Sequence, residues 1–451
     1  MISGYLRLAL LLAAVPGAAA AQDRPVVRTV DGPVRGATEG GIVAFKGIPF
    51  AAPPVGALRW RAPQPVARWT TVRDATAYAA DCMQLPFPSD AAPLGTAPAE
   101  DCLYANVWRP AGDARKLPVM VWIYGGGFVN GGSSPPTYSG AALARSGILV
   151  MSFNYRLGRF GSFAHPGLKP ADADYGLLDQ LAALRWVKAN IARFGGDPGN
   201  VTIIGESAGG MSVHAMLSSP AAAGLFQRAV VQSGGDGSSH GVSLATAEAA
   251  GVAFASGKGI TADDPQAAAK LRALPAEQVI DGLNLASMGQ GGYSGPVPDG
   301  RTFVDARAAY DAGRFAKVPV MIGATSADIG GPTGPMIAGA RDVAALLASK
   351  GVPVYHYRFD YVATSAQTPQ TKGAGHATDI PFFFDTAAIK YGAATSDTDR
   401  AAARTISRYL VNFVKTGDPN GPDLPAWGRY TATARPMLTL TRAGTAQVAP
   451  E

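Results

Sequence analysis

Short apolar runs rich in valine, isoleucine and leucine recur along the chain and predict β-strands. These runs lie at 119–124, 148–154, 200–205, 228–232, 318–323 and 352–359. Between the second and third runs, apolar residues recur at helical spacing and predict a helix at 177–194: Leu178, Leu181, Leu184, Trp186, Val187 and Ile191. Further helices are predicted at 208–217, 338–349 and 398–415. Strands that alternate with helices in this way predict an α/β fold, in which helices flank a large, mostly parallel central sheet.

The composition is that of a chain with a substantial core. Hydrophobic residues make up 47% of the 451 positions and charged residues only 16%, which excludes an intrinsically disordered chain. No internal repeat or low-complexity linker divides positions 22–451. We therefore predict one α/β domain over 22–451, although a chain of this length could form two.

The N-terminal residues have the layout of a cleaved secretory signal peptide. Arg7 precedes an apolar stretch at 8–15, and small residues at 19–21 precede Gln22. A membrane anchor is the alternative, but this stretch is far shorter than the roughly 20 residues that a span requires, and Pro16 follows it. The sequence predicts a signal peptide at 1–21 and a secreted or periplasmic mature protein without a membrane span.

The charged and cysteine residues narrow the range of partners. The net charge is +6, but the basic residues are scattered without a basic run, so the sequence does not indicate a nucleic-acid partner. Cys82 and Cys102 are the only cysteines. In an exported chain such a pair favours a disulfide over a metal site, because no Cys-x-x-Cys or histidine cluster accompanies it. Two reduced thiols are the alternative.

One serine stands at a predicted turn between a strand and a helix. The segment 203–210 reads IIGESAGG, and Ser207 lies between the strand at 200–205 and the helix that follows. Gly205 and Gly209 lack the side chains that would clash at a sharp turn. The turn would lift the Ser207 hydroxyl above the sheet edge as a candidate nucleophile. The alternative is a plain glycine-rich turn with a helix-capping serine, because short motifs also match by chance.

A second glycine-rich segment offers donors for a reaction intermediate. The segment 121–132 reads VWIYGGGFVNGG and begins in a predicted buried strand. An acyl-transfer intermediate carries an oxyanion that needs backbone N–H groups about 3 Å away, and glycine best allows so close an approach. Gly126 and Gly127 are the candidate oxyanion-hole residues, with Ala208 as a third donor.

Several long stretches resemble the type B carboxylesterase family, a branch of the α/β-hydrolases that includes cholinesterases. They read FKGIPFAAPPVGALRW (45–60), EDCLYANVW (100–108), NYRLGRFG (154–161), DYGLLDQLAALRWVKANIARFGGDP (174–198) and FVKTGDPNG (413–421). The resemblance implies an α/β-hydrolase fold. It also supports one disulfide and implies two structural ion pairs: Cys82 with Cys102, Arg59 with Glu100, and Arg156 with Asp179.

The resemblance also indicates which histidine acts as the base. His376 lies in GAGHATDIPFFF (373–384), which is similar to the family's histidine loop, and Asp379 follows where the family commonly has a carboxylate. His214 lies seven positions beyond Ser207 on the predicted helix, where we expect a packed or hydrogen-bonded role. For the other histidines the default is a surface or structural role: His165, His240 and His356.

The orienting acid is expected at Asp328, which stands in VMIGATSADIGGP where the family pattern places its acid. Many α/β-hydrolases of this branch use glutamate, so the shorter aspartate would have to approach His376 more closely. Asp299 and Asp360 are the alternatives, each more simply interpreted as structural. The order Ser207, Asp328, His376 is the nucleophile, acid and base order expected of this fold.

These residues together predict a serine carboxylesterase that hydrolyses small-molecule esters through an acyl-enzyme, without a metal or an organic cofactor. Glu206, beside the nucleophile, is expected either to line the pocket or to have a buried, hydrogen-bonded role. The alternative function is that of a non-catalytic adhesion or binding ectodomain of the same fold, since some relatives have lost catalytic residues. All three candidate catalytic positions are present here, which favours an enzyme.

The candidate disulfide loop bears on the class of ester. Cholinesterases carry an aromatic choline-binding residue in this loop, whereas the segment 81–102 contains Phe87 but no tryptophan. A quaternary ammonium group needs an aromatic face for a cation–π contact. We therefore expect no preference for quaternary ammonium esters.

The spacing of the candidate site residues bears on the size of the pocket. From Asp328 to His376 is only 376 − 328 = 48 positions, which is short for this family. The glycine-rich stretch 286–300 adds only Met288 and Tyr293 as large side chains. We predict a wide pocket that tolerates bulky uncharged esters, unless other loops replace the missing cover.

Overall fold

The computed structural model describes residue 1 and residues 24–87, 92–168, 172–239, 242–289 and 292–451. The predicted signal peptide at 1–21 lies outside the described residues, apart from Met1, and it stays a prediction. In the described part of the chain, no helix is both long enough and apolar enough to cross a membrane.

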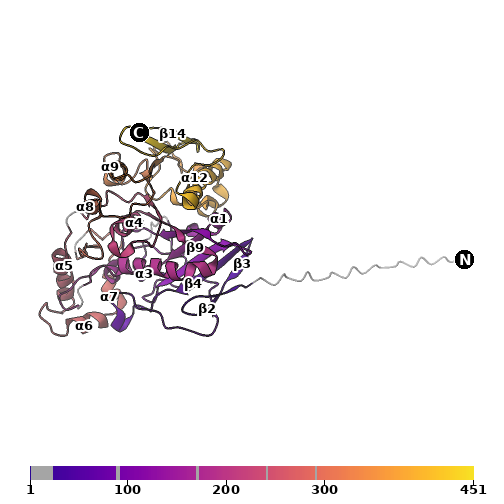
Figure 1. Cartoon of the computed structure of the whole chain (residues 1–451). Helices are drawn as coiled ribbons and strands as arrows, with labels where there is room; N and C mark the ends of the chain where they lie inside the picture. Colours follow the sequence, from indigo (N-terminus) through magenta and orange to yellow (C-terminus); the bar gives the residue numbers. More distant parts are fainter. Residues whose placement is uncertain (2–23, 88–91, 169–171, 240–241, 290–291) are drawn as a thin grey trace.

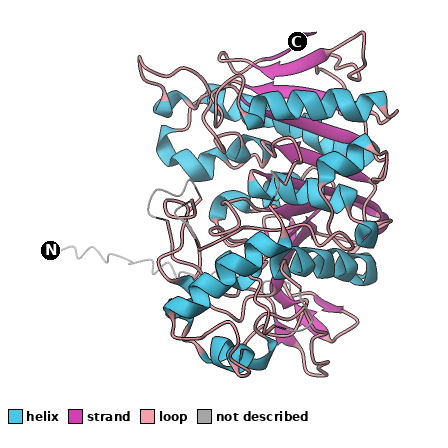
Figure 2. Ribbon diagram, turned by 90° about the vertical axis from the view of Figure 1, so that its left-hand side faces the viewer, coloured by secondary structure: helices cyan, strands magenta, loops and turns pink. Residues whose placement is uncertain are grey.

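The described residues form a central sheet of eleven strands with helices on either side (Figure 2). Seven neighbouring strands in the middle run parallel: β8 (Leu149–Phe153), β7 (Leu117–Ile123), β9 (Gly196–Glu206), β10 (Arg228–Gln232), β11 (Val320–Thr325), β12 (Val354–Phe359) and β13 (Pro436–Leu440). Antiparallel strands complete both edges: β6 (Tyr104–Pro110), β4 (Ile42–Pro49) and β3 (Ala37–Glu39) on one side and β14 (Ala446–Pro450) on the other. The predicted large, mostly parallel sheet is therefore confirmed.

The six predicted strands correspond to β7 to β12. These strands are largely buried on both faces, which explains why the sequence shows them as apolar runs. Every residue of β8 and of β11 is buried, so both strands are continuous apolar or small-residue runs. A separate small sheet of three strands lies near the N-terminus: β1 (Val26–Arg28), β2 (Pro33–Arg35) and β5 (Arg73–Asp74).

The four predicted helices are present with small shifts at their ends. They are α3 (Tyr175–Asn190), α4 (Ala208–Ser218), α9 (Pro335–Ser349) and α12 (Asp397–Thr416). The predicted helix at 177–194 ends as an α-helix at Asn190 and continues as the 3₁₀ turn η3 (Ile191–Phe194), after which Gly195 takes a left-handed conformation with φ of 90°. Helix α12 begins with a capping box in which Ser396 and Asp399 bond each other's backbone N–H groups.

Further helices connect and surround the sheet. The α-helices are α1 (Ala141–Ala144), α2 (Gly158–Gly161), α5 (Leu244–Gly257), α6 (Ala267–Ala273), α7 (Ala276–Ile280), α8 (Ala306–Asp311), α10 (Ile380–Phe383) and α11 (Ala387–Tyr391). The short 3₁₀ helices are η1 (Gly56–Leu58), η2 (Pro136–Tyr138), η4 (Pro220–Ala222), η5 (Thr364–Ala366) and η6 (Gly392–Ala394). Helices α5, α6 and α7 gather at one end of the molecule (Figure 1), where they contribute to a second hydrophobic cluster that includes Phe254, Leu271 and Val279.

The main hydrophobic core follows the central sheet. One continuous cluster of buried side chains contains residues from Val27 to Leu440. Helix α4 packs on β9 and β10, and helix α9 packs on β11 and β12. This packing fixes the ends of β9, β10 and β11, from which the candidate site is built.

Candidate active site

Ser207 occupies the sharp turn that the sequence predicts. It lies between the end of β9 and the start of α4, with φ of 57° and ψ of −124°, a backbone conformation that is unusual for a residue with a side chain. A Cβ on Gly205 would lie 2.3 Å from the carbonyl oxygen of Gly209, and a Cβ on Gly209 would lie 2.0 Å from that of Ile123. The glycines on both sides of Ser207 are therefore required by close backbone contacts, as predicted.

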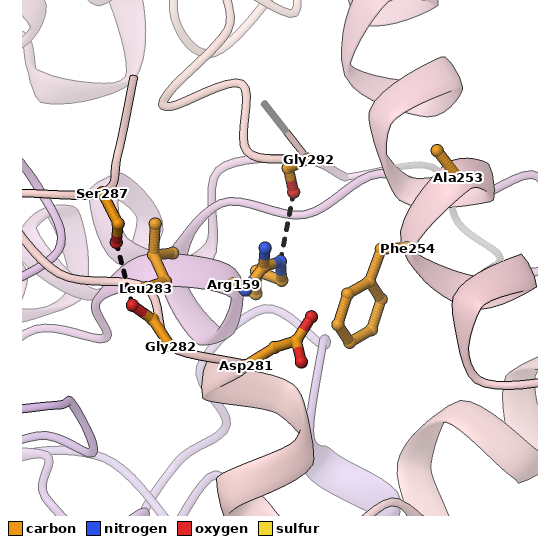
Figure 3. Close-up of a pocket in the computed structure, with 8 residues that line it drawn as sticks. All are labelled: Arg159, Ala253, Phe254, Asp281, Gly282, Leu283, Ser287 and Gly292. Carbon is orange, nitrogen blue, oxygen red and sulfur yellow. Dashed lines mark hydrogen bonds between the residues drawn. The ribbon is translucent and has the colours of Figure 1, made fainter. Parts of the chain in front are cut away.

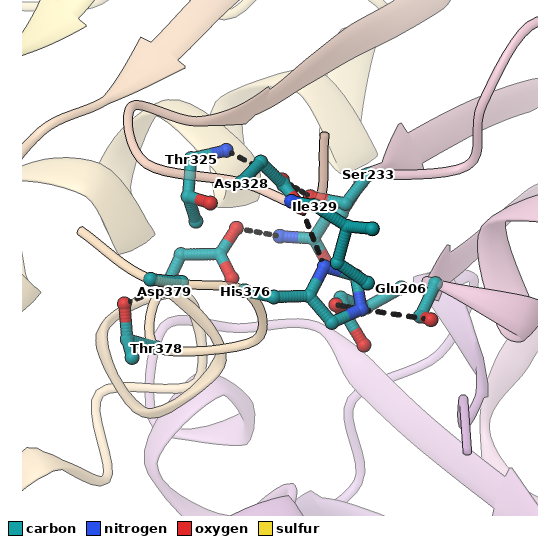
Figure 4. Close-up of polar contacts among 11 residues, drawn as sticks. Glu206, Ser233, Thr325, Asp328, Ile329, His376, Thr378 and Asp379 are labelled. Carbon is teal, nitrogen blue, oxygen red and sulfur yellow. Dashed lines mark hydrogen bonds and ion pairs between the residues drawn. The ribbon is translucent and has the colours of Figure 1, made fainter. Parts of the chain in front are cut away.

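Ser207, His376 and Asp328 form one chain of hydrogen bonds. Figure 4 shows the imidazole of His376 between Asp328 and Glu206. The Nε2 atom of His376 lies 2.9 Å from Ser207 Oγ, and its Nδ1 atom lies 2.6 Å from Asp328 Oδ1. The carboxylate bonds the imidazole directly, so the shorter aspartate reaches the histidine without a bridging group. The structure thus brings together the three candidate catalytic residues from positions far apart in the sequence.

The sheet topology explains why these residues meet. Strands β9, β10 and β11 are parallel neighbours, so their carboxyl ends lie along one edge of the sheet. Ser207 follows β9, and Asp328 lies shortly after the end of β11. The loop that carries His376 is tied to the Asp328 loop by the Ala327 N–H, which donates to the Ala374 carbonyl at 2.8 Å. The Asp328 loop and the His376 loop are therefore held together by a backbone hydrogen bond.

Asp328 is held by donors on both of its oxygens. Oδ2 accepts from the Ser233 hydroxyl at 2.6 Å and from the Thr325 N–H at 3.1 Å, and Oδ1 also accepts from the Ile329 N–H at 2.7 Å. Burial alone would raise the pKa of Asp328, but the hydrogen bond and positive charge of His376, with the bonds from Ser233 and Ile329, lower it below its usual value. Asp328 is therefore ionised and fixed in orientation.

Sequence reasoning did not identify Ser233. It directly follows β10, the strand between those that carry Ser207 and Asp328, and it has an unusual φ of 47°. A polar residue at the carboxyl end of the intervening parallel strand was the one available signal. Its hydroxyl supports Asp328 from the side opposite His376.

A second carboxylate approaches the imidazole. Glu206 is buried, and its Oε1 atom lies 3.3 Å from His376 Nε2. Burial alone would lower the pKa of His376, but the Asp328 hydrogen bond and the charges of Glu206, Asp328 and Asp379 together raise it to about 9. Burial, and then the charge of Asp328, raise the pKa of Asp379 to about 7. Glu206 thus has the buried position that the sequence allowed and also stabilises the imidazolium.

The triple-glycine segment runs directly against the Ser207 turn. A Cβ on Gly125 would lie 2.9 Å from Ser207 Cβ. Gly126 and Gly127 have φ values of 110° and 62°, which glycine adopts at little cost. The N–H groups of Gly126 and Gly127 have no hydrogen-bond acceptor among the described residues. Ala208 is the first residue of α4, so its N–H group has no acceptor within the helix. The role of these donors in an oxyanion hole stays a prediction.

Comparison with known proteins identifies the family. A sequence model described as "Carboxylesterase family" matches residues 23–333 and 334–450. The chain belongs to the carboxylesterase family. It is 34% identical to the para-nitrobenzyl esterase of Bacillus subtilis (strain 168), over 94% of this chain and 96% of that protein. It is also 32% identical to the Fumonisin B1 esterase of Sphingopyxis macrogoltabida, over 96% of this chain and 90% of that protein.

Solved structures support the same assignment. A PNB esterase structure superimposes with a TM-score of 0.84 at 31% identity, and the match covers 94% of this chain and 97% of that one. The acetylcholinesterase of Bungarus fasciatus is 32% identical, over 90% of this chain and 81% of that protein. This carboxylesterase therefore has the α/β-hydrolase fold and is a carboxylic ester hydrolase.

The other histidines that the structure describes have partners outside this hydrogen-bond chain. His214 is buried, and its Nδ1 atom lies 2.8 Å from the Tyr310 hydroxyl, which confirms the expected packed role. His356 is buried within β12. His165 is also buried rather than on the surface, and its Nδ1 atom accepts from the Gly167 N–H at 3.0 Å. His240 lies outside the described residues.

The alternative acids have structural partners. Asp299 accepts from the backbone N–H groups of Arg301 and Thr302, each at 2.7 Å, and so stabilises its own turn. Asp360 bonds the Ser326 hydroxyl and the Arg442 guanidinium. Neither carboxylate contacts His376 among the interactions of the described residues, whereas Asp328 bonds its Nδ1 atom.

The structural pairings implied by the family resemblance are present. Cys82 and Cys102 form a disulfide with an S–S distance of 2.06 Å. Each ion pair is bidentate: Arg59 bonds Glu100 at 2.8 and 2.5 Å, and Arg156 bonds Asp179 at 2.8 and 2.7 Å. Within the described ranges, no group of three or more histidine, cysteine, aspartate or glutamate side chains is arranged to hold a metal ion.

A cavity of about 490 Å³ lies beside the segment 281–287 (Figure 3). It is lined by Arg159, Ala253, Phe254, Asp281, Gly282, Leu283, Ser287 and Gly292, none of which is a candidate catalytic residue. Leu285 and Met288 pack over Gly127, where an added Cβ would lie 2.9 Å and 2.8 Å from their side chains. Met288 thus contributes bulk directly beside the candidate oxyanion loop.

Proposed function

We propose that Ser207 is the nucleophile of this carboxylesterase, His376 its general base and Asp328 the acid that orients the base. The observation that carries the proposal is the continuous contact from Ser207 Oγ through His376 to Asp328, at 2.9 and 2.6 Å. Ser207 Oγ attacks the ester carbonyl carbon while its proton passes to His376 Nε2. The carbonyl oxygen becomes an oxyanion.

The oxyanion is stabilised by the backbone N–H groups of Gly126, Gly127 and Ala208. The imidazolium then protonates the departing alkoxide, so the alcohol leaves and an acyl-enzyme remains. Water attacks this ester in the same way, giving its proton to His376. The imidazolium returns a proton to Ser207 as the carboxylic acid leaves.

The two buried carboxylates stabilise the charge that appears on the imidazole. Asp328 accepts a hydrogen bond from Nδ1, which leaves Nε2 free to take the proton from Ser207. Glu206 lies 3.3 Å from Nε2 on the side of the reacting atoms. His376 is neutral in the form of the enzyme that attacks the ester and charged during the attack, so both carboxylates favour the transition state over that form. Because the pKa of His376 is raised to about 9, the fraction of enzyme in that form increases with pH.

We further propose that the substrates are uncharged esters, including bulky ones. Only α9, β12 and the short η5 turn lie between Asp328 and His376, which supports a pocket with little cover from that interval. The disulfide loop supplies Phe87 but no tryptophan, which is consistent with no preference for quaternary ammonium esters.

We also propose that residues 1–21 are removed as a signal peptide and that 22–451 forms one exported domain. The Cys82–Cys102 disulfide supports an oxidising compartment. The continuous core from Val27 to Leu440 supports one domain.

Labelling with a fluorophosphonate tests the catalytic assignment, because this reagent modifies only a serine that is activated for attack. We expect the wild-type esterase to be labelled with one equivalent, and Ser207→Ala to abolish labelling. His376→Ala should slow it by several orders of magnitude. Ser218→Ala, at the other end of α4, serves as the matched control, because its hydroxyl bonds only the His214 and Ala215 carbonyls. A folded wild-type protein that is not labelled would favour the non-catalytic alternative.

A further inference from the structure

Gln84 is a buried amide whose hydrogen-bonding atoms are directed at the base of the glycine loop. It lies two residues after Cys82 and is only 6% exposed. Its Oε1 atom accepts from the Gly131 N–H at 2.9 Å and from Asn130 Nδ2 at 3.1 Å. Its Nε2 atom donates to the Gly131 carbonyl at 2.6 Å and to the Cys82 carbonyl at 2.9 Å. One side chain therefore fastens the disulfide segment to residues 130 and 131.

Asn130 extends this connection to the candidate oxyanion loop. It is fully buried, and its backbone N–H donates to the Gly126 carbonyl at 2.9 Å. Its side-chain Oδ1 accepts from the Leu285 N–H at 2.9 Å. Leu285 in turn packs over Gly127. Asn130 thus holds the loop by its backbone and holds the cover of the loop by its side chain.

The bonds at Gly126 set the direction of the next N–H group. The Gly126 carbonyl accepts from the N–H groups of Val129 at 3.1 Å and Asn130 at 2.9 Å. In a trans peptide, the carbonyl of one residue and the N–H of the next lie in one plane and point in opposite directions. The two bonds therefore fix the peptide plane and direct the Gly127 N–H away from the turn.

Close backbone contacts restrict movement of the peptide between Gly126 and Gly127. A Cβ on Gly126 would lie 2.2 Å from the Asn130 carbonyl oxygen, and a Cβ on Gly131 would lie 2.5 Å from the Gly125 carbonyl oxygen. Residues 125–126 and 130–131 are therefore in direct backbone contact. A displacement of Gly131 is transmitted to the peptide that carries the Gly127 N–H.

We propose that Gln84 is a positioning residue for the oxyanion hole, because it holds Asn130 and Gly131 and thereby orients the Gly127 donor. The inference rests on the proposed function, in which Gly127 donates to the oxyanion. Gln84 itself contacts no reacting atom and acts only through Asn130 and Gly131. Its effect should appear in the transition state, where the oxyanion forms, and hardly at all in the binding of the planar ester.

Two ketones separate these effects. A trifluoromethyl alkyl ketone accepts Ser207 Oγ at its carbonyl carbon, the serine proton passes to His376, and the carbonyl oxygen becomes a stable oxyanion. The corresponding methyl ketone binds without forming a stable adduct. The inhibition constants of both ketones and the values of kcat and KM for a p-nitrophenyl ester are measured for wild type and Gln84→Ala. Asn190→Ala is the matched control, since Asn190 is also a buried amide bonded to backbone, at Val30 and Trp186, away from the loop.

We expect Gln84→Ala to lower kcat about tenfold, less than the hundredfold or more that follows loss of an oxyanion donor itself. The affinity for the trifluoromethyl ketone should fall by a similar factor, while KM and the affinity for the methyl ketone change by less than about twofold. Gln84→Glu keeps the acceptor for Gly131 and Asn130 and should therefore lose less activity. If Gln84→Ala does not fold, the same inhibition and kinetic constants are measured for Gln84→Glu. Asn190→Ala should retain wild-type values.

Either of two results would overturn the inference: trifluoromethyl ketone affinity unchanged in the Gln84 variants, or equal losses for both ketones. A failure of the proposed function gives a different result. In that case the wild-type protein itself does not bind the trifluoromethyl ketone more tightly than the methyl ketone. The wild-type measurements therefore distinguish the two failures.

Discussion

The charge of Glu206 should control the pH range in which the esterase is active, and Glu206→Gln removes that charge with little change of shape. Glu206 Oε1 lies 3.3 Å from His376 Nε2, the atom that must be unprotonated for catalysis. The carboxylate is almost fully buried, whereas the imidazole is 22% exposed. The interaction is therefore only partly screened by water.

The distance gives the size of the effect. Two unit charges at this separation interact by about 5 kcal/mol at an effective dielectric constant of about 20, which is an upper bound because solvent reaches the imidazole. Opposite charges within about 4–6 Å generally shift a pKa by about one to three units. We expect Glu206→Gln to lower the pKa of His376 by at least about one unit from its raised value.

The size of the effect on kcat/KM differs between high and low pH. Above the pKa of His376, the free enzyme is neutral at the imidazole and the transition state is charged, so loss of Glu206 lowers kcat/KM by about tenfold per unit of pKa shift. Below the pKa, the free enzyme and the transition state both carry the protonated imidazole. Loss of Glu206 then destabilises both equally and leaves kcat/KM unchanged. The two pH profiles should therefore nearly coincide at low pH and diverge as the pH rises.

The assay is kcat/KM for a p-nitrophenyl ester between about pH 5 and 10, within the range where the fold is shown to be intact by circular dichroism. Asp311→Asn, which removes an exposed carboxylate paired with Arg307 on α8, is the control and should leave the profile unchanged. If the midpoint of the Glu206→Gln profile stays in place or moves to higher pH, Glu206 does not stabilise the protonated imidazole.

Three further predictions concern the acid, the disulfide and the pocket. Ser233→Ala removes the hydroxyl that bonds Asp328 Oδ2 and should lower kcat about tenfold with little change in KM; an unchanged kcat would show that this bond does not support the acid. Replacing Cys82 and Cys102 by serine should lower the free energy of unfolding in urea by about 3 kcal/mol, because the disulfide joins residues 20 positions apart. A decrease below about 1 kcal/mol would contradict this expectation. A bulky aromatic ester should have a kcat/KM within about a hundredfold, roughly 2.7 kcal/mol, of that of a short-chain ester with the same leaving group; a larger deficit would contradict the wide pocket.

The middle of the sheet was predictable from the sequence, whereas its edges were not. Strands such as β8 are buried on both faces and therefore form continuous apolar runs. Strand β4 reads IVAFKGIP, in which Lys46 and Gly47 interrupt the apolar pattern near an irregularity in its pairing with β6. Strand β14 is mostly exposed along its length and carries no such signal. Strands β4 and β14 were therefore missed because one has an irregular pairing and the other a solvated face.

The candidate nucleophile, base and acid could be found because each lies in a recognisable local segment. The residues that support them could not, because their contacts join distant parts of the chain. Ser233 bonds Asp328 across 95 positions, and Gln84 bonds Gly131 across 47. No local pattern encodes either contact, and both follow only from the topology of the folded chain.

The residue that carries the acyl group during turnover decides whether Ser207 is the nucleophile. A p-nitrophenyl dimethylcarbamate transfers its carbamoyl group to an activated serine, and the product is hydrolysed slowly enough to be isolated by acid quenching and mapped by peptide mass spectrometry. We expect a burst of one p-nitrophenol per protein molecule and one carbamoyl group on Ser207, both absent in Ser207→Ala. A carbamoyl group on any other residue, or a full burst that persists in Ser207→Ala, would contradict this assignment.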